Sequence, residues 1–245
     1  MSLIKTEWEK DKVYLVQFPR TGVIPCPSPY SLKLETWLRM AEIPYENVSN
    51  EFKHFSTRGQ QPFIEFNGTQ ISDSSIIIET LAKTFGGKGD VLNALPPKDK
   101  AIEHPWIASD KGYARLVTGV KAFFLKNLVV PRFESRLKAK INGQWIGTLT
   151  KEEVVKEIKK DIDAISAQLG EKSYLFGENA KTIDATLFGH LAQILYTPQF
   201  TEEIRAYIET KTPNLITFVN RIKEKYWPDW DEICETLNIN TDPKK

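Results

Sequence analysis

The chain is poor in the residues that build metal centres and disulfide frameworks. Its 245 residues include only two cysteines, Cys26 and Cys234, and three histidines, His54, His104 and His190. The cysteines lie too far apart in the sequence for a disulfide-rich scaffold, and the histidine spacings match no metal motif. We therefore expect no metal site, and the cysteine usage is typical of a reducing, cytoplasmic compartment.

Long apolar runs and an excess of one charge are also missing. No run approaches the roughly 20 apolar residues that a membrane-spanning helix needs, and the opening residues lack the apolar core of a signal peptide. Lys and Arg number 33 and Asp and Glu number 32, so the formal net charge is +1. The two signs are interleaved, which argues against a nucleic-acid partner and against an anionic membrane surface.

Strand and helix patterns alternate in the first third of the chain. Segments rich in β-branched and aromatic residues predict strands over 12–18, 44–48, 63–66 and 69–72. Apolar residues at helical spacing predict helices over about 29–42 and about 74–86. Asn67-Gly68 between the last two strands is a strong hairpin signal. The order β-α-β-β-β-α predicts a compact α/β unit whose first two strands are parallel and joined by a right-handed crossover.

Strand patterns disappear after this unit. Helical spacing predicts helices over 152–169, 183–196, 201–211 and 213–225. The stretch 98–146 is also predicted to be helical, although its proline and glycine residues blur the helix limits. We therefore predict an α/β domain over 1–87, a linker over 88–97 and an all-α domain over 98–245.

Two dipeptides flank the predicted hairpin and suggest a binding pocket. Gln61-Pro62 precedes its first strand, and Asp73-Ser74 follows its second strand where a helix begins. A helix start presents free N–H groups and the positive end of the macrodipole, which suit a carboxylate. The same residues also fit an ordinary strand-start proline and an N-cap. We favour the pocket, and a capping residue can also contact a ligand.

The segment Cys26-Pro27-Ser28-Pro29-Tyr30-Ser31 opens the first predicted helix. Ser28 fits the N-cap and Pro29 the first helical position. A serine hydroxyl here can donate a hydrogen bond to a bound thiolate and lower the pKa of that thiol, or it can only cap the helix. Tyr30 and Ser31 are the alternative donors. Cys26 lies before the helix, and we interpret it as a loop cysteine rather than a redox thiol.

Four stretches resemble the glutathione transferase superfamily in its metaxin-like branch, which includes the failed axon connections and cadmium-responsive proteins. They are SPYSLKLETWLRMAEIPYE (28–46), QPFIEFNGTQISDSSIIIETL (61–81), YLFGENAKTIDATLFGHLAQ (174–193) and TPNLITFVNRIKEKYWPDW (212–230). The resemblance implies a thioredoxin-like N-terminal domain followed by a helical C-terminal domain. It also implies glutathione bound mainly on the first domain, with an apolar co-substrate in the cleft between them.

The resemblance assigns a role to each candidate residue. It implies a cis peptide bond at Gln61-Pro62, with the backbone of Gln61 pairing with the bound thiol peptide. The Ser74 hydroxyl and amide would donate to the γ-glutamyl carboxylate of glutathione, and Asp73 would accept from its ammonium. Ser28 would then be the residue that activates the glutathione thiol.

The sequence departs from the family pattern at four positions. Gln17 stands where tyrosine-type transferases carry their catalytic tyrosine, and Ser28 stands where cysteine-type relatives carry cysteine. Many metaxin-like relatives have a cysteine where this chain has Ser31. Lys181 replaces the Ser or Thr that usually stands three residues before Asp184.

Two functions from different classes follow from these residues. The favoured one is a glutathione transferase that conjugates or transfers glutathione to small hydrophobic electrophiles, as in detoxification, with glutathione as substrate and no metal. The alternative is a non-catalytic adaptor that retains the transferase fold. A homodimer is compatible with either function.

Overall fold

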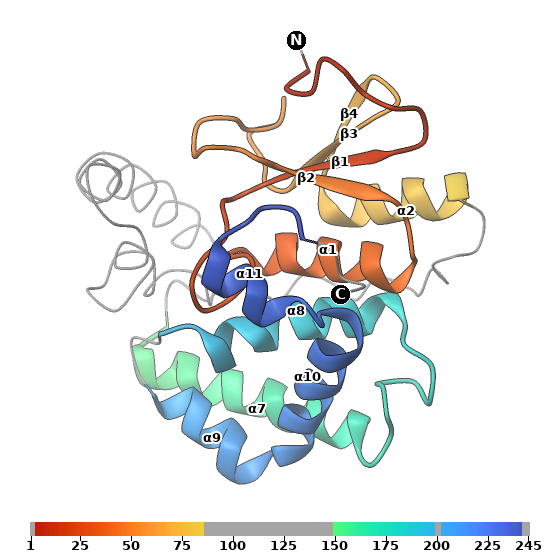
Figure 1. Ribbon diagram of the computed structural model, residues 1–245. Helices are drawn as coiled ribbons and strands as arrows, with labels where there is room; N and C mark the ends of the chain where they lie inside the picture. The colour runs from red at the N-terminus through yellow and green to blue at the C-terminus, as the bar shows by residue number, and fades with distance from the viewer. Residues whose placement is uncertain (1–2, 86–148, 199–201, 242–245) are drawn as a thin grey trace. The chain divides into compact units, whose positions relative to one another are not determined.

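The computed structural model describes residues 3–85, 149–198 and 202–241, which are coloured in Figure 1. The linker predicted over 88–97 and the helical stretch predicted over 98–146 lie outside these residues. The domain boundary predicted after residue 87 lies there too, so these three expectations stay predictions.

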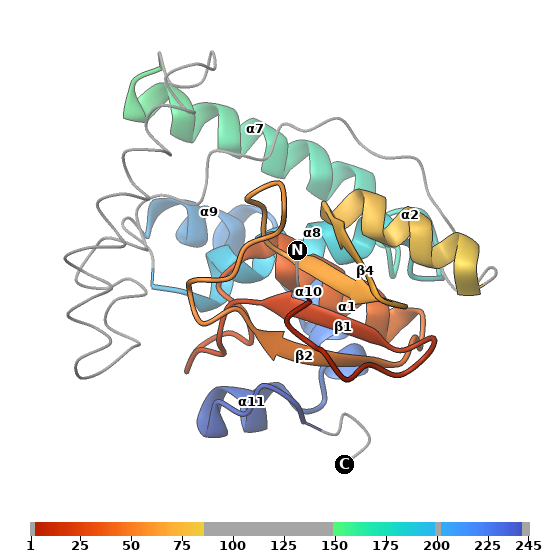
Figure 2. The same cartoon turned by 90° about the horizontal axis from the view of Figure 1, so that it is seen from above.

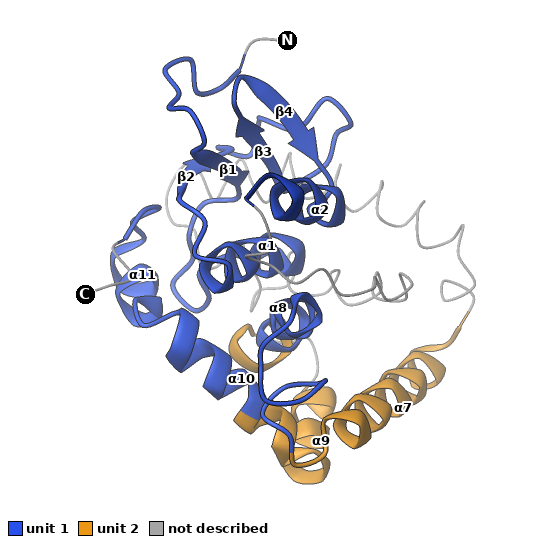
Figure 3. Cartoon of the chain, turned by 90° about the vertical axis from the view of Figure 1, so that its right-hand side faces the viewer, with its two compact units in different colours: residues 1–95, 172–193, 218–245 blue, residues 96–171, 194–217 orange. Residues whose placement is uncertain are grey.

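The chain forms two compact units, coloured separately in Figure 3. Unit 1 comprises residues 1–95, 172–193 and 218–245, and unit 2 comprises residues 96–171 and 194–217. Unit 1 therefore combines the predicted α/β domain with two later segments of the chain. All the candidate site residues named above belong to unit 1.

A four-stranded sheet forms the centre of unit 1 (Figure 1). Its strands are β1 (Val13–Gln17), β2 (Tyr45–Ser49), β3 (Phe63–Phe66) and β4 (Thr69–Ser72), which confirms the four predicted strands. The spatial order is β2-β1-β3-β4, with β1 parallel to β2 and β3 antiparallel to both of its neighbours. Asn67 and Gly68 join β3 to β4 with φ angles of 47° and 77°, as a tight hairpin turn requires.

Two helices, α1 (Pro29–Met40) and α2 (Ser74–Phe85), cover one face of this sheet (Figures 1 and 2). Their apolar stripes meet alternate residues of the strands in one buried cluster, which includes Val13, Leu15, Ile64, Phe66, Leu34, Trp37, Leu38, Ile77, Ile78 and Leu81. Burying one such side chain contributes about 1.5–3 kcal/mol. This core fixes both helices, and hence their first residues, against the sheet.

The first part of α8 (Thr182–Tyr196) belongs to unit 1 and packs closely on α1. Trp37 of α1 donates its indole N–H to the hydroxyl of Thr182 at 3.1 Å. Gly189 permits the close approach, because a Cβ atom there would lie 2.6 Å from the backbone oxygen of Pro29. Asp184 accepts from the backbone N–H of Lys181 at 2.8 Å, so its carboxylate still reaches back to the helix start despite the missing Ser or Thr.

The remaining described helices confirm the predicted helical pattern within two residues at each end. They are α7 (Lys151–Leu169), α9 (Glu203–Lys211) and α10 (Pro213–Tyr226), with α7 and α9 in unit 2. A capping box at Thr150 and Glu153 starts α7. A short helix, α11 (Trp230–Thr236), was not predicted, because its seven residues give too few turns for a helical spacing to show.

Candidate functional site

The strand register brings the candidate residues together at one end of the sheet in unit 1. Phe63, the first residue of β3, pairs with Val16 near the end of β1 and with Ser72 at the end of β4. The two residues before Phe63 and the two after Ser72 therefore lie at the same end of the sheet. Both α1 and α2 begin at this end, since β1 and β4 run parallel and each leads into a helix.

The peptide bond between Gln61 and Pro62 is cis, as the resemblance implies. Gln61 lies outside the paired register of β3, so its backbone takes no part in the sheet ladder. Its side-chain amide turns toward the preceding loop and donates to the carbonyl of His54 at 2.7 Å. Pairing of the Gln61 backbone with a ligand stays a prediction.

Asp73 is the N-cap of α2. Its Oδ1 atom accepts from the N–H of Ser75 at 2.9 Å and from the N–H of Ile76 at 3.3 Å. Asp73 adopts a left-handed conformation with φ of 79°, which turns the chain sharply from β4 into the helix. Its second carboxylate oxygen makes no hydrogen bond to the residues that the structure describes, and it remains available as an acceptor.

Ser74 supplies two donors at the same helix start. Only 7% of the residue is exposed, and within the described part of the chain neither its hydroxyl nor its backbone N–H makes a hydrogen bond. The first intrahelical bond runs from the N–H of Ile77 to the carbonyl of Asp73, so the Ser74 amide is one of the orphan donors of the first turn. A carboxylate fits these donors and the positive end of the helix.

Ser28 is the N-cap of α1, as predicted, and it is 8% exposed. Its Oγ atom accepts from the N–H of Ser31 at 3.3 Å. A hydroxyl that accepts one hydrogen bond keeps its own proton to donate. Capping the helix and donating to a thiolate are therefore compatible for this side chain.

The alternative donors differ in their surroundings. Ser31 is fully buried, and its hydroxyl interacts with the thiol of Cys26 but has no other hydrogen-bond partner among the described residues. Tyr30 is partly buried, and its ring meets the ring of His190 edge to face, with 5.6 Å between the centroids. Ser28 is therefore slightly more exposed than Ser31 at the start of α1, at 8% against 0%.

Cys26 and Gln17 do not take the place of the missing catalytic groups. Burial raises the pKa of the Cys26 thiol to about 11, despite the backbone N–H of Ser28 and the charge of Arg20. Such a thiol is unreactive near neutral pH. The Gln17 amide is fully buried and donates to Glu35 and Asn47, at 2.7 Å in each case. Gln17 therefore serves as a hydrogen-bond donor in the buried interior of unit 1.

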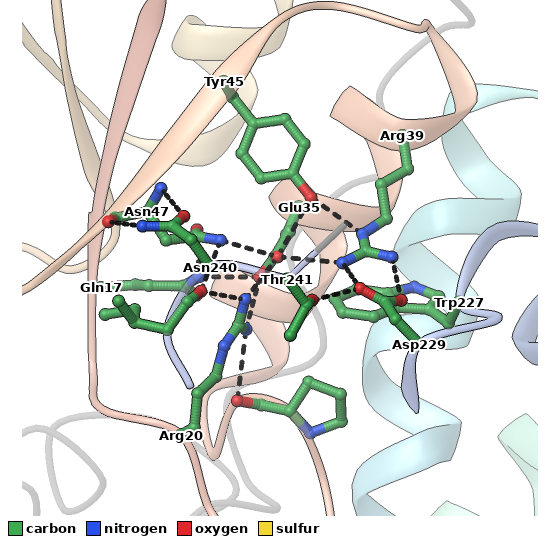
Figure 4. A network of polar contacts seen from close by, with 12 residues as sticks. Gln17, Arg20, Glu35, Arg39, Tyr45, Asn47, Trp227, Asp229, Asn240 and Thr241 are labelled. Atoms are coloured by element: carbon green, nitrogen blue, oxygen red, sulfur yellow. Dashed lines mark hydrogen bonds and ion pairs between the residues drawn. The ribbon is translucent and has the colours of Figure 1, made fainter. Parts of the chain in front are cut away.

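Gln17 belongs to a buried polar network, shown in Figure 4, that is centred on the carboxylate of Glu35. Arg20 forms two hydrogen bonds to this carboxylate, at 2.7 and 2.8 Å. Burial alone would raise the pKa of Glu35, but the attraction of Arg20 outweighs it and lowers this pKa to about 2. Glu35 is therefore ionised in the folded chain at neutral pH.

The network extends to the C-terminal residues of unit 1. Arg39 of α1 binds Asp229 with distances of 2.5 and 2.9 Å, and its guanidinium stacks on the ring of Trp227 (Figure 4). Asn240 donates to the carbonyl of Asn47 and accepts from its N–H, as a neighbouring strand would. The edge strand β2 is thereby covered at Asn47.

Lys33 is a buried cation that the sequence analysis did not single out. It lies on α1 with 8% of the residue exposed, and its Nζ atom lies 3.3 Å from the hydroxyl of Ser75 on α2. Lys33 stands four residues before Trp37, on the buried stripe of the helix. A lysine on that stripe was the available signal.

The described residues contain neither a metal-binding cluster nor a membrane-spanning helix. No group of three or more His, Cys, Asp or Glu side chains there is arranged to hold a metal ion. No helix within the same residues is long and apolar enough to cross a bilayer.

Two family models match the chain. The glutathione S-transferase N-terminal domain matches residues 29–109, and the glutathione S-transferase C-terminal domain matches residues 158–222. Solved transferases share the fold at low identity. The β-etherase LigF from Sphingobium aligns with a TM-score of 0.57 at 19% identity, over 91% of this chain and 99% of that chain. A glutathione-bound transferase from Ceriporiopsis subvermispora aligns with a TM-score of 0.58 at 17% identity, over 88% and 97%.

Curated relatives point to one branch of this superfamily. Failed axon connections of Drosophila melanogaster is 36% identical over 96% of this chain, and the chain spans 63% of that relative's length. Metaxin-2 of Mus musculus is 22% identical over 91% of each chain. The isoprene-epoxide glutathione S-transferase of a Rhodococcus strain is 29% identical over 83% of this chain and 94% of its own length.

The chain therefore belongs to the glutathione S-transferase superfamily, in its metaxin-like branch. This confirms the predicted fold, a thioredoxin-like N-terminal domain followed by a helical transferase C-terminal domain.

Proposed function

We propose that the chain binds glutathione at the end of the sheet where α1 and α2 begin, and that it conjugates glutathione, or transfers it, to small hydrophobic electrophiles. The observation that carries this proposal is the start of α2. Ser74 offers a hydroxyl and an amide, and Asp73 offers one carboxylate oxygen, none of them hydrogen-bonded to the described residues. These groups suit the carboxylate and the ammonium of a γ-glutamyl group. The backbone of Gln61, beside Pro62, pairs with the cysteinyl part.

The chemistry assigned to the chain is activation of a thiol. The Ser28 hydroxyl donates to the glutathione sulfur and favours its ionised form, which lowers the pKa of the thiol. The thiolate attacks an electrophilic carbon, forming a C–S bond while the leaving group departs with its bonding electrons. With an epoxide the C–O bond breaks, and the resulting alkoxide takes a proton. Tyr30 and Ser31 are the alternative donors.

Small epoxides and aryl halides are the substrates to test first. The Rhodococcus relative carries isoprene epoxide in its name, which supports epoxides as one class. The charge balance and cysteine usage of the chain support the cytoplasm as its compartment.

A second candidate function is a non-catalytic adaptor that keeps the fold. The observation that favours it is Gln17, which replaces the catalytic tyrosine and is bound into the buried network by Glu35 and Asn47. The likeness to metaxin-2 and to Failed axon connections supports the same candidate.

Calorimetry with reduced glutathione, followed by turnover of an aryl halide and a small epoxide, separates the two functions. Binding with turnover supports the transferase, and binding without turnover on either substrate supports the adaptor. Absence of glutathione binding contradicts a glutathione site altogether.

A further inference from the structure

Residues 237–241, which follow α11, form an exposed strap on unit 1. Three of the five residues are exposed and the other two are half-buried. The groups that the strap contacts are nevertheless buried, since the side chain of Arg20 is 1% exposed and Asn47 is 4% exposed. The strap is therefore a surface segment that is bound to interior groups through polar contacts (Figure 4).

Hydrogen bonds hold the strap in place. The carbonyl of Ile239 accepts from the side-chain amide of Asn47 at 3.2 Å. Asn240 exchanges two hydrogen bonds with the backbone of Asn47, and Thr241 donates to the carboxylate of Asp229 (Figure 4). Each such bond adds little net stability, because water replaces it when the segment leaves. The strap can therefore detach while the core of unit 1 stays folded.

Arg20 connects the strap to the loop over residues 18–28, which precedes α1. Each terminal nitrogen of Arg20 bonds one oxygen of Glu35 and one backbone carbonyl. The carbonyls are those of Ile239, at 2.9 Å, and Pro25, at 3.4 Å. A guanidinium is planar and rigid, so these bonds fix the two carbonyls relative to each other. Pro25 stands three residues before Ser28, so the strap is linked to the segment that carries the N-cap of α1.

A second contact joins this loop to the helix from which the strap emerges. A Cβ atom at Gly22 would lie 3.7 Å from the backbone oxygen of Cys234 in α11, so the two backbones lie against each other. Within the loop, the hydroxyl of Thr21 donates to the carbonyl of Ile24, which closes a compact turn. The loop therefore contacts α11 at its exposed turn and the strap at its buried arginine.

We propose that the strap is a conformational switch for the start of α1. When bound, it holds the loop over residues 18–28 and the N-cap Ser28 in place; when it detaches, the loop and the first turn of α1 loosen. The functional consequence of this switch rests on the proposed glutathione chemistry. Among the described residues the strap makes no hydrogen bond to the start of α2. Detachment should therefore slow activation of the thiol more than it weakens glutathione binding at Ser74.

Hydrogen exchange in the double variant Asn240→Ala/Thr241→Val, made in the whole chain, tests the coupling. The amides of Ser31 and Leu32 are the probes, because they donate to the hydroxyl and the carbonyl of Ser28. Both should exchange about 10-fold faster than in the wild type, since the strap loses hydrogen bonds of ordinary strength.

Controls separate this coupling from a general loss of stability. The amide of Ile77 donates to the carbonyl of Asp73 at the start of α2, and it should keep its wild-type rate in the double variant. Asn238→Ala changes an exposed strap residue, and Thr241→Ser keeps the hydroxyl, so both should leave the two probe amides unchanged. If the double variant fails to fold, the single variant Asn240→Ala takes its place.

Kinetics then measure the consequence for the site. With glutathione and an aryl halide, the double variant should lose about 10-fold in kcat, while its calorimetric affinity for glutathione stays at the wild-type value. An unchanged kcat in the double variant of an active wild type would overturn the switch as a regulator of the site.

The exchange results decide the inference separately from the proposed function. Faster exchange of the probe amides with an unchanged Ile77 amide supports the switch, even if the wild type neither binds nor turns over glutathione and the proposed function fails. Unchanged probe amides would show that the strap only covers β2. Equal acceleration of the probe amides and of the Ile77 amide would show a general loss of stability. Either of these two results overturns the inference.

Discussion

Arg20 and Glu35 form a bidentate ion pair inside unit 1, with N···O distances of 2.7 and 2.8 Å. Their side chains are 1% and 0% exposed. Arg20 comes from the loop after β1 and Glu35 from the middle of α1. The pair therefore anchors the loop that leads to Ser28. The same guanidinium donates to the carbonyl of Ile239 at 2.9 Å, which joins this loop to the C-terminal segment.

Glu35→Ala should destabilise the chain by about 3–5 kcal/mol, because it leaves the buried charge of Arg20 without its partner. The pKa of Glu35 is lowered to about 2 in the folded chain from an ordinary value of 4.5. Its stabilising contribution is complete above the ordinary pKa and is lost as the pH falls toward 2.

Urea unfolding between pH 6 and pH 3 measures this contribution. Glu35→Gln, which cannot titrate, should show a weaker loss of stability on acidification than the wild type. Equal pH dependence in the two proteins would show that the ion pair does not govern acid stability.

Gly189→Ala should destabilise the packing of α8 on α1 by about 1–3 kcal/mol. The added Cβ would lie 2.6 Å from the oxygen of Pro29 and 2.9 Å from the nitrogen of Lys33, and neither backbone atom can turn away. Gly22→Ala is the matched control, since its Cβ would meet only the oxygen of Cys234, at 3.7 Å. Thermal unfolding of both variants tests this, and equal melting temperatures would refute the close contact.

Asn240→Ala should expose the edge of β2, because the Asn240 side chain makes two hydrogen bonds to the backbone of Asn47, at 2.7 and 3.0 Å. Each such bond contributes about 0.5–1.5 kcal/mol. Hydrogen exchange at the Asn47 amide should become faster. Asn238→Ala, two residues earlier on an exposed part of the segment, is the control and should leave that amide protected.

Ser74→Ala should weaken glutathione binding by about 1–2 kcal/mol, since it removes a hydrogen bond to a charged group. The free energy of unfolding should change less, because Asp73 rather than Ser74 caps the helix. Calorimetry together with urea unfolding separates the two effects. Thr80→Ala, at a half-buried position further along α2, serves as the control, and unchanged affinity in folded Ser74→Ala would remove Ser74 from the site.

The local features of the fold could be predicted from the sequence because their causes are local. Asn67-Gly68 needs only the φ preferences of its own residues to make a hairpin. Pro29 and Ser28 mark a helix start through capping chemistry alone. The cis bond before Pro62 followed from the family resemblance rather than from the residue itself.

The parts that escaped prediction depend on contacts between distant residues. Arg39 and Asp229 are 190 positions apart, and no spacing pattern links them. Lys33 of α1 can contact Ser75 of α2 only because both helices begin at the same end of the sheet, which the strand register decides. Gln17 was noted only as a departure from a catalytic tyrosine, and its binding to Glu35 is visible only in the folded chain.

The pH–rate profile of Ser28→Ala tests the central claim most directly. With glutathione and an aryl halide as substrates, the wild type should turn over near neutral pH. Ser28→Ala should lose most of kcat/KM there, because the pKa of the bound thiol rises without the Ser28 hydroxyl. The difference should shrink at alkaline pH, where the thiolate forms unaided. Ser31→Ala and Tyr30→Phe, measured alongside, should keep the wild-type profile. Full activity of Ser28→Ala at every pH, or no turnover by the wild type, would contradict the account.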